Sequence, residues 1–134
     1  MILVDTGAWY ALVNEADANH GRAAEFVRRR VPREFGQLIT TNYVLAETLT
    51  LLRVRLGLEA VRRFVALLGR TRILRVFWVG EDRHRLGLDL MLQYRDKLWS
   101  FTDCTSFVLM RELDVADAFT FDENFAQGGF RIHP

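Results

Sequence analysis

Short apolar runs alternate along the chain with longer segments in which apolar residues recur every third or fourth position. The short runs are rich in Val, Ile and Phe and are typical of buried strands, whereas the longer spacing is typical of helices that pack one face on a core. We predict strands at residues 2–4, 38–40, 73–79, 116–121 and 130–133. We predict helices at residues 6–12, 19–30, 42–56, 58–69, 81–94 and 100–110.

Glycine and proline mark several of the predicted boundaries. Gly57 separates two helices, Pro32 follows the arginine-rich end of another, and Gly128 with Gly129 turns the chain into its last strand. No Gly/Ser-rich linker or internal repeat interrupts the sequence, so we expect residues 1–134 to form a single domain. Strands that alternate with helices predict an α/β fold, a three-layer α/β/α sandwich around a mainly parallel sheet.

The composition is that of an ordinary globular protein, with 50% hydrophobic and 26% charged residues. No apolar run approaches the roughly 20 residues that span a bilayer, and the first residues lack the basic flank and cleavage site of an export signal. The lone cysteine, Cys104, suits a reducing compartment and is expected to be a small core residue. We therefore expect a cytoplasmic protein with no membrane partner.

The charge balance alone does not indicate a nucleic-acid partner. The formal net charge is only +1, and long-range attraction of a polyanion needs a larger excess or a clustered patch. Lys97 is the only lysine among the 18 basic residues, and the others are arginines, which suit bidentate phosphate contacts. Genomic codon bias explains the same preference, so the arginines leave the question open.

Two aspartates come directly after predicted strands. Asp5 follows the strand at 2–4, and Asp122 follows the strand at 116–121. Because ligand sites of open α/β sheets lie at the carboxyl ends of the strands, both side chains could enter one crevice. The alternative for each is to cap the helix or turn that follows it.

Two further acids lie in predicted helices. Glu47 is the only charged residue between Leu38 and Leu52, in a helix that otherwise looks buried, and a buried carboxylate needs a partner. An ordinary position on the polar side of that helix is the alternative. Asp103 begins a helix and, taken alone, is explained as a cap; Ser106 lies one turn further along the same face.

Convergence of the four acids would change their chemistry. Two like charges about 4 Å apart repel by roughly 4 kcal/mol at an effective dielectric near 20, so a carboxylate cluster needs a cation. Hard oxygen ligands without a matching set of cysteines or histidines favour Mg²⁺ or Mn²⁺ over zinc. Such a cation can activate water against a phosphodiester, which is nuclease chemistry.

Four segments, in order along the chain, resemble the four acidic motifs of PIN domains. They are residues 2–8, 40–47, 100–107 and 118–125, and residues 129–131 resemble the closing strand of that family. The resemblance covers essentially the whole chain. It implies metal-binding and catalytic roles for four acids, Asp5, Glu47, Asp103 and Asp122. The hydroxyls of Thr6 and Ser106 would support them. Asp117 and Glu123 flank the last motif as substitute ligands.

The resemblance also implies a function. PIN domains of this kind are Mg²⁺- or Mn²⁺-dependent endoribonucleases that hydrolyse RNA to a 3′-hydroxyl and a 5′-phosphate without a covalent enzyme intermediate. The short length favours a VapC-type toxin of a type II toxin–antitoxin system, which implies a homodimer and a small VapB-like antitoxin that occludes the acidic crevice. A stand-alone RNA-processing nuclease is an alternative. A non-catalytic PIN scaffold that binds RNA or protein is less favoured, because it has no reason to keep four mutually repelling acids.

Other enzyme classes fit the sequence less well. A phosphatase of the haloacid dehalogenase type needs a second aspartate two residues after the first, where this chain has Gly7. A receiver domain needs a lysine late in the chain, but Lys97 precedes Asp103. The three histidines lack zinc-ligand spacing, and we expect each to be a surface or packing residue.

Overall fold

A five-stranded sheet lies at the centre of the protein, whose computed structural model describes residues 1–134. The strand order is β3-β2-β1-β4-β5, and every neighbouring pair is parallel. The strands are β1 (Ile2–Val4), β2 (Leu38–Thr41), β3 (Leu74–Phe77), β4 (Asp117–Phe119) and β5 (Arg131–His133). The predicted α/β class and parallel sheet are confirmed.

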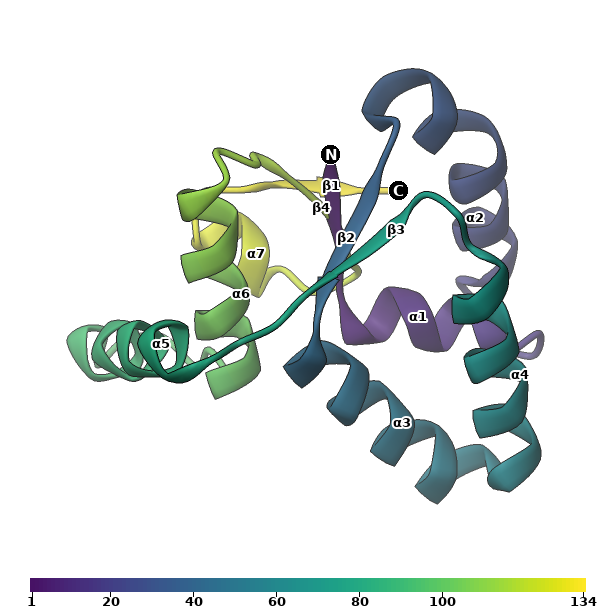
Figure 1. Ribbon diagram of the computed structural model, residues 1–134, viewed down its shortest axis with the longest axis horizontal. Helices are drawn as coiled ribbons and strands as arrows, with labels where there is room; N and C mark the ends of the chain where they lie inside the picture. The colour runs from purple at the N-terminus through teal and green to yellow at the C-terminus, as the bar shows by residue number, and fades with distance from the viewer.

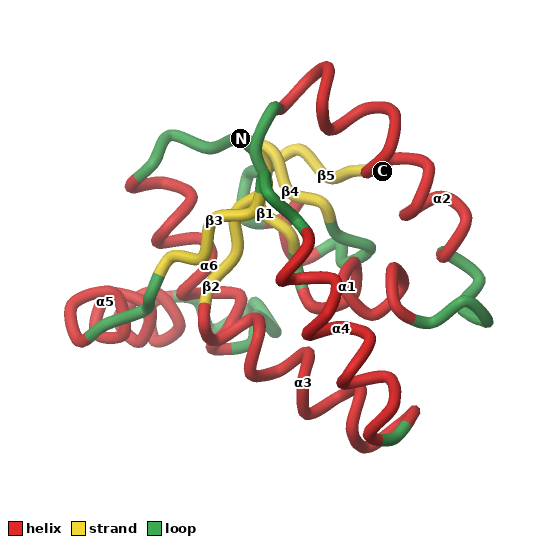
Figure 2. The backbone as a smooth tube through the Cα atoms, turned by 45° about the vertical axis from the view of Figure 1, so that its right-hand side comes forward, coloured by secondary structure: helices red, strands yellow, loops and turns green.

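Helices cover both faces of this sheet. On one side lie α1 (Thr6–Val13), α2 (His20–Glu25), the π-helical segment η1 (Phe26–Phe35), α3 (Asn42–Leu56) and α4 (Leu58–Arg70). On the other side lie α5 (Glu81–Gln93), α6 (Phe101–Glu112) and α7 (Asn124–Gln127). Figure 1 and Figure 2 show the strands between these two helical layers, as the three-layer sandwich requires. None of the helices is both long and apolar enough to cross a membrane.

The central strand β1 contributes to both cores. Ile2 and Val4 belong to the core on the side of α1 and α3, whereas Leu3 belongs to the core on the side of α6. Successive side chains of a strand point to opposite faces of the sheet, so all three are fully buried. Packing from both faces fixes the end of β1 and therefore the position of Asp5, which follows it.

The strand β4 ends earlier than the sequence predicts. It stops at Phe119, and the hydroxyl of Thr120 accepts a hydrogen bond from the backbone N–H of Asp122 at 3.0 Å. Thr and Ser side chains that bond to nearby backbone offer the chain an alternative to the strand ladder. The prediction that Asp122 directly follows a strand is therefore wrong: it lies in a turn that Thr120 stabilises.

The arginine-rich helix does not end before Pro32 as predicted. It continues as η1 through Pro32 to Phe35, and Gly36, at φ 73°, follows it. Phe26 and Val31 of this segment are buried in the core. Pro32 has no backbone N–H and therefore removes one hydrogen bond from this segment, in which each bond spans five residues. The core packing of Phe26 and Val31 holds the segment helical despite that loss.

The helices α5 and α6 approach closely at Gly87. A Cβ atom on Gly87 would lie 2.7 Å from Cγ2 of Thr105 and 3.4 Å from the Cα of the same residue. Only a residue without a side chain therefore allows this contact. Cys104, next to Thr105, is fully buried, which confirms its predicted place in the core.

Candidate active site

A pocket of about 370 Å³ opens at the carboxyl edge of the sheet, where β1 and β4 end and α3 and α6 begin. Ten residues line it, and none of them is a lysine, arginine or histidine. They are Asp5, Thr6, Gly7, Glu47, Leu98, Ser100, Asp103, Phe121, Asp122 and Asn124. The four predicted acids thus face one space, although they are up to 117 positions apart in the sequence.

Asp5 is a buried carboxylate that does not cap the helix it precedes. It occupies the N-cap position of α1, but its side chain makes no capping hydrogen bond. Instead its Oδ2 accepts a hydrogen bond from the Thr120 hydroxyl at 3.0 Å, and the residue is only 7% exposed. The capping alternative for Asp5 is therefore not what the structure shows.

Burial raises the pKa of Asp5 from its usual value to about 7. A backbone hydrogen bond from Thr6 and the Thr120 hydroxyl act in the opposite direction, while the charges of Asp103 and Glu47 raise the pKa further. Removal from water disfavours the charged form, and like charges add to that cost. The pocket therefore holds an acid whose ionised form calls for a compensating positive charge.

Asp103 combines a capping role with a place in the pocket. Its backbone N–H donates to Ser100 Oγ at 2.9 Å, and its Oδ2 accepts from the Ser100 backbone N–H at 3.0 Å, which forms a capping box at the start of α6. The same Oδ2 also accepts from Asn124 Nδ2 at 3.2 Å. Burial raises the pKa of Asp103, and these hydrogen bonds partly offset the effect.

Asp122 and Asn124 form the outer wall of the pocket. Asp122 is exposed, and its Oδ1 accepts the backbone N–H of Asn124 at 2.9 Å in a local turn. The side-chain amide of Asn124 lies 3.4 Å from Asp122 Oδ2 and 3.2 Å from Asp103 Oδ2. One neutral amide group thus donates to two of the four acids.

Glu47 is exposed, contrary to the expectation of a buried carboxylate. It lies on a face of α3 with Ala46 and Thr50, and its side chain makes no hydrogen bond or ion pair. Helix α3 buries Val44, Thr48 and Leu52 on another face. The uncharged residues around Glu47 line an apolar groove of about 710 Å³ between α3 and the start of α6. Glu47 lines both this groove and the acidic pocket, so the two adjoin there.

The two predicted supporting hydroxyls differ in position. Thr6 lines the pocket, and its Oγ1 is buried without a hydrogen-bond partner. Ser106 is also buried without a partner for its Oγ, but it is not among the residues that line the pocket. Thr6 is thus the one of the two with an unused oxygen at the site.

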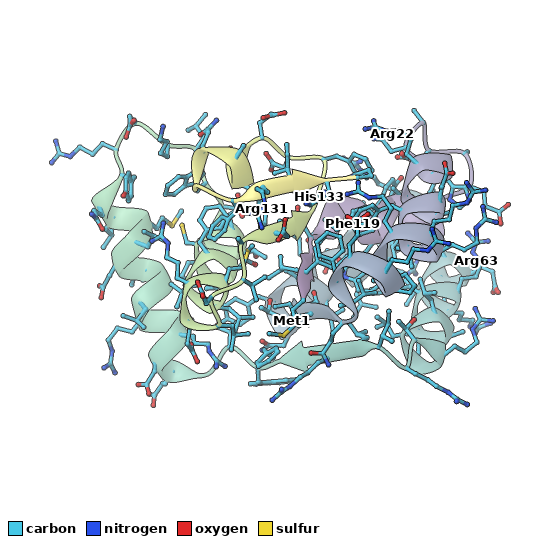
Figure 3. All side chains as sticks on the ribbon, turned by 90° about the horizontal axis from the view of Figure 1, so that it is seen from above. Met1, Arg22, Arg63, Phe119, Arg131 and His133 are labelled. Atoms are coloured by element: carbon cyan, nitrogen blue, oxygen red, sulfur yellow. The ribbon has the colours of Figure 1, made fainter.

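The two proposed substitute ligands lie outside the pocket. Asp117 is at the first position of β4, at the opposite end of the strand, where it pairs with Arg131 at 2.7 Å and with His133 at 2.8 Å. Figure 3 labels Arg131 and His133 side by side on β5. Glu123 is exposed and does not line the pocket either. Asp117 is therefore excluded as a ligand, because its carboxylate is already neutralised at the far edge of the sheet.

The pocket suits a hard divalent cation in its chemistry. No three Asp, Glu, His or Cys side chains are close enough together to enclose an ion as they stand. The donors that line the pocket are nevertheless carboxylate and hydroxyl oxygens, which Mg²⁺ and Mn²⁺ prefer. The raised pKa of Asp5 and the unpartnered Oγ1 of Thr6 are both features that a bound cation would relieve.

Sequence reasoning missed Thr120 and Asn124 as site residues. Thr120 joins Asp5 to the backbone of Asp122, and Asn124 joins Asp103 to Asp122. The turn at Asp122 uses only the backbone N–H of Asn124, so it does not indicate a role for the Asn124 side chain. Thr120 could not be predicted either, since its role depends on where β4 ends.

A parallel α/β sheet with an acidic pocket at the carboxyl ends of its strands occurs in proteins with different activities, so the fold alone does not define the function. The family model of the PIN domain matches residues 2–130 of this chain. The protein therefore belongs to the PIN-domain family.

Two relatives, one of them also known as a crystal structure, cover almost the whole chain. The 23S rRNA-specific endonuclease VapC20 of Mycobacterium tuberculosis is 36% identical over 130 residues, which are 97% of this chain and 95% of that protein. A VapC ribonuclease of Archaeoglobus fulgidus is 28% identical over 125 residues, which are 92% of this chain and 78% of that protein. The crystal structure of Mycobacterium tuberculosis VapC20, a toxin that cleaves the sarcin–ricin loop, matches with a TM-score of 0.90 at 35% identity over 100% of both chains.

Proposed function

We propose that this protein is a Mg²⁺- or Mn²⁺-dependent endoribonuclease and the toxin of a type II toxin–antitoxin pair. The observation that carries the proposal is that the four acids of the PIN motifs line one pocket. The similarity to VapC relatives over nearly the full chain supports the ribonuclease activity and the toxin class. We further propose that residues 1–134 are one PIN domain, which is supported by a single sheet that includes strands from both ends of the sequence.

The proposed reaction is hydrolysis of an RNA phosphodiester. The oxygen of water bonds to phosphorus and the bond from phosphorus to the 3′ oxygen breaks, which leaves a 3′-hydroxyl and a 5′-phosphate. A bound divalent cation supplies positive charge that lowers the pKa of water and stabilises charge on the phosphoryl oxygens. Of the four acids predicted to bind the metal, we propose Asp5, Asp103 and Asp122 as its ligands with support from Thr6, and we assign Glu47, which is exposed, a different role.

The remaining groups orient these ligands and handle the proton. The hydroxyl of Thr120 fixes Oδ2 of Asp5, and the amide of Asn124 keeps Asp103 and Asp122 together. Glu47 is exposed and makes no hydrogen bond, so its carboxylate is free to accept the proton that the attacking water releases. Ser106, a buried residue of α6 that does not line the pocket, is assigned a packing role rather than a ligand role.

The proposed setting is the cytoplasm, with a homodimer and a small VapB-like antitoxin as partners. The VapC relatives support the antitoxin, and the absence of a disulfide and the buried thiol of Cys104 suit a reducing compartment. Side chains such as Val54 (78% exposed) and Leu98 (94% exposed) leave apolar surface beside the pocket that a protein contact would cover. Light scattering of the purified protein during size-exclusion chromatography tests the homodimer.

The experiment that tests the proposed function is cleavage of RNA by purified, antitoxin-free protein. Total RNA and intact ribosomes are incubated with Mg²⁺ or Mn²⁺, because the VapC20 relative acts on 23S rRNA. EDTA and the Asp103→Asn variant serve as controls. Asparagine keeps an oxygen that can accept the Ser100 N–H of the capping box, so the variant should fold.

We expect metal-dependent cuts that disappear in both controls and whose new 5′ ends can be mapped by sequencing. Cleavage that persists in EDTA would contradict the metal dependence. Folded protein that cuts neither free RNA nor ribosomes would favour the non-catalytic scaffold, whereas cuts confined to precursor RNA would favour the stand-alone processing nuclease.

A further inference from the structure

The acidic pocket has no cation of its own to attract RNA. None of its ten lining residues is basic, and four of them are acids. RNA is a polyanion, and contacts between basic side chains and phosphates supply most of the sequence-independent affinity of proteins for nucleic acids. The residues that hold the RNA backbone must therefore lie beside the pocket rather than inside it.

Arg22 is the arginine that contacts a residue of the pocket wall. It projects from α2 at the edge of the molecule (Figure 3), and its guanidinium carbon lies 5.8 Å from the centroid of the Phe121 ring. Phe121 lines the acidic pocket. No acidic side chain forms an ion pair with Arg22, so its charge is free for a phosphate.

Arg22 also belongs to a second, basic groove. This groove, of about 230 Å³, is lined by Arg22, Arg29 and Arg30 together with Glu25, Phe26 and Pro134. Arg29 and Arg30 each pair with a glutamate one helical turn away. The exposed pair of Arg29 with Glu25 is of the weak kind that exchanges readily with other partners, whereas Arg30 holds Glu34 through two hydrogen bonds of 2.8 and 2.7 Å.

The basic side chain on the opposite rim is less suited to the same task. Lys97 precedes Leu98, which lines the pocket, but its ammonium cannot bind a phosphate through two parallel hydrogen bonds as a guanidinium does. Segment 20–35, in contrast, carries five arginines and only two glutamates. The segment of α2 and η1 beside Phe121 therefore carries more positive than negative side chains.

On the basis of the proposed function, we propose that Arg22 and the groove of Arg29 and Arg30 bind backbone phosphates of the RNA strand next to the scissile phosphate. The strand runs from the acidic pocket over Phe121 to α2. The planar guanidinium matches the geometry of a phosphate with two parallel hydrogen bonds. The ring of Phe121 restricts Arg22 at the rim, so less side-chain entropy is lost when the phosphate binds.

Equilibrium binding of a fluorescent single-stranded RNA, measured by anisotropy, tests this subsite without cleavage. EDTA is present throughout, and KCl is varied between about 50 and 200 mM. For Arg22→Ala we expect roughly tenfold weaker RNA binding at low salt. We also expect the slope of log Kd against log salt concentration to be smaller by about 0.7 for each phosphate that the variant no longer binds. Arg22→Lys should keep most of the slope, because it keeps the charge, and lose part of the affinity.

Arg85→Ala is the matched control. Arg85 is an exposed arginine on α5, which lies on the other side of the molecule from α2, and it has no ion-pair partner. Its variant should bind RNA with wild-type affinity and slope. In cleavage assays with the metal present, the loss in Arg22→Ala should appear in KM rather than in kcat.

The outcomes separate this inference from the proposed function. An Arg22→Ala protein with wild-type affinity and slope overturns the phosphate subsite, while cleavage by the wild-type protein leaves the nuclease intact. Equal losses in Arg22→Ala and Arg85→Ala also overturn it, since they indicate diffuse attraction. Wild-type protein that neither binds nor cuts RNA overturns the proposed function, and the subsite with it.

Discussion

Asp5 is a pocket residue whose ionisation destabilises the metal-free fold. Its pKa is raised to about 7 in the folded protein, chiefly by burial, whereas in an unfolded chain an aspartate ionises near 3.9. Below about pH 4 the group is protonated in both states and contributes nothing to the pH dependence. As the pH rises from about 4 to about 7, only the unfolded chain releases the proton, so the folded state becomes progressively less stable.

The Asp5→Asn variant should therefore stabilise the protein without metal. In EDTA at pH 8 we expect its free energy of unfolding to exceed that of the wild type by about 1–4 kcal/mol, and near pH 4 we expect no gain. Urea denaturation at the two pH values measures the difference. RNA cleavage should be lost, because the variant removes a ligand charge.

Asp122→Asn provides the comparison for this measurement, because Asp122 is exposed and its replacement should change the stability much less. An equal gain for Asp5→Asn at both pH values would point to packing rather than charge. Full ribonuclease activity of Asp5→Asn would contradict the role proposed for this residue.

Asn124 has a role that is separable from metal binding. Its amide donates to Asp103 and Asp122, and its hydrogen bond lowers the pKa of Asp103. Without a cation, Asn124→Ala should lower the free energy of unfolding by about 1–3 kcal/mol, as expected for hydrogen bonds to charged groups. At saturating Mn²⁺ the gap between variant and wild type should narrow, since the cation neutralises the same carboxylates. Thermal melts with and without Mn²⁺ measure both quantities, and a gap that widens with metal would contradict this interpretation.

At the level of elements, the contact of α5 with α6 depends on Gly87. We expect Gly87→Ala to destabilise the fold by about 1–3 kcal/mol, because its methyl group would meet Thr105 at 2.7 Å. This cost outweighs the gain of up to about 1 kcal/mol that alanine brings to a helix interior. Chemical denaturation of the variant measures the effect.

Gly69 offers the matched control for this substitution. It also lies within a helix, α4, but a Cβ there would have no atom within 4 Å. Gly69→Ala should therefore be neutral or stabilise the protein by up to about 1 kcal/mol. If both alanine variants stabilise the fold, α5 can shift away from α6 at little cost.

The elements that the sequence predicted well are those with strong local signals. The central strand Ile2–Val4 and the helix that ends before Gly57 follow from apolar pattern and from a glycine at φ 88°. The end of β4 was missed because of a local hydrogen bond between Thr120 and Asp122, and the end of the arginine-rich helix because of a tertiary contact. Core burial of Phe26 and Val31 carries a helix through Pro32, and no local pattern encodes that contact.

The site shows the same division between local and distant information. The four acids could be chosen because the segments that carry them resemble family motifs in the same order along the chain. The hydroxyl of Thr120 could not, because its partner Asp5 is 115 residues away. The exposure of Glu47 was also missed, since an uncharged helix face can line an open groove as well as a core.

For the whole molecule, metal binding should appear as stability. A cation that binds only the folded state raises the free energy of unfolding by about 2.7 kcal/mol at a hundred times its Kd. We expect Mn²⁺ to raise the melting temperature more at pH 8 than at pH 6, because protons compete for Asp5, whose pKa is about 7. Melting curves with Mn²⁺ and with EDTA at both pH values measure this. If Mn²⁺ raises the melting temperature equally at both pH values, the ion binds away from Asp5. The same conclusion follows if Mn²⁺ raises the melting temperature of Asp5→Asn as much as that of the wild type.

The bond from Thr120 to Asp5 joins segments that a ribosome makes at very different times. Domains tend to fold as their segments emerge, beginning with the N-terminal ones. Here the strand β1 can meet its neighbour β2 early, but β4 and the turn that carries Asp122 are synthesised long afterwards. The pocket can therefore assemble only when translation of this region is nearly finished. Until β4 emerges, a nascent chain carries Asp5 without the Thr120 hydroxyl that fixes its carboxylate, and without Asp122.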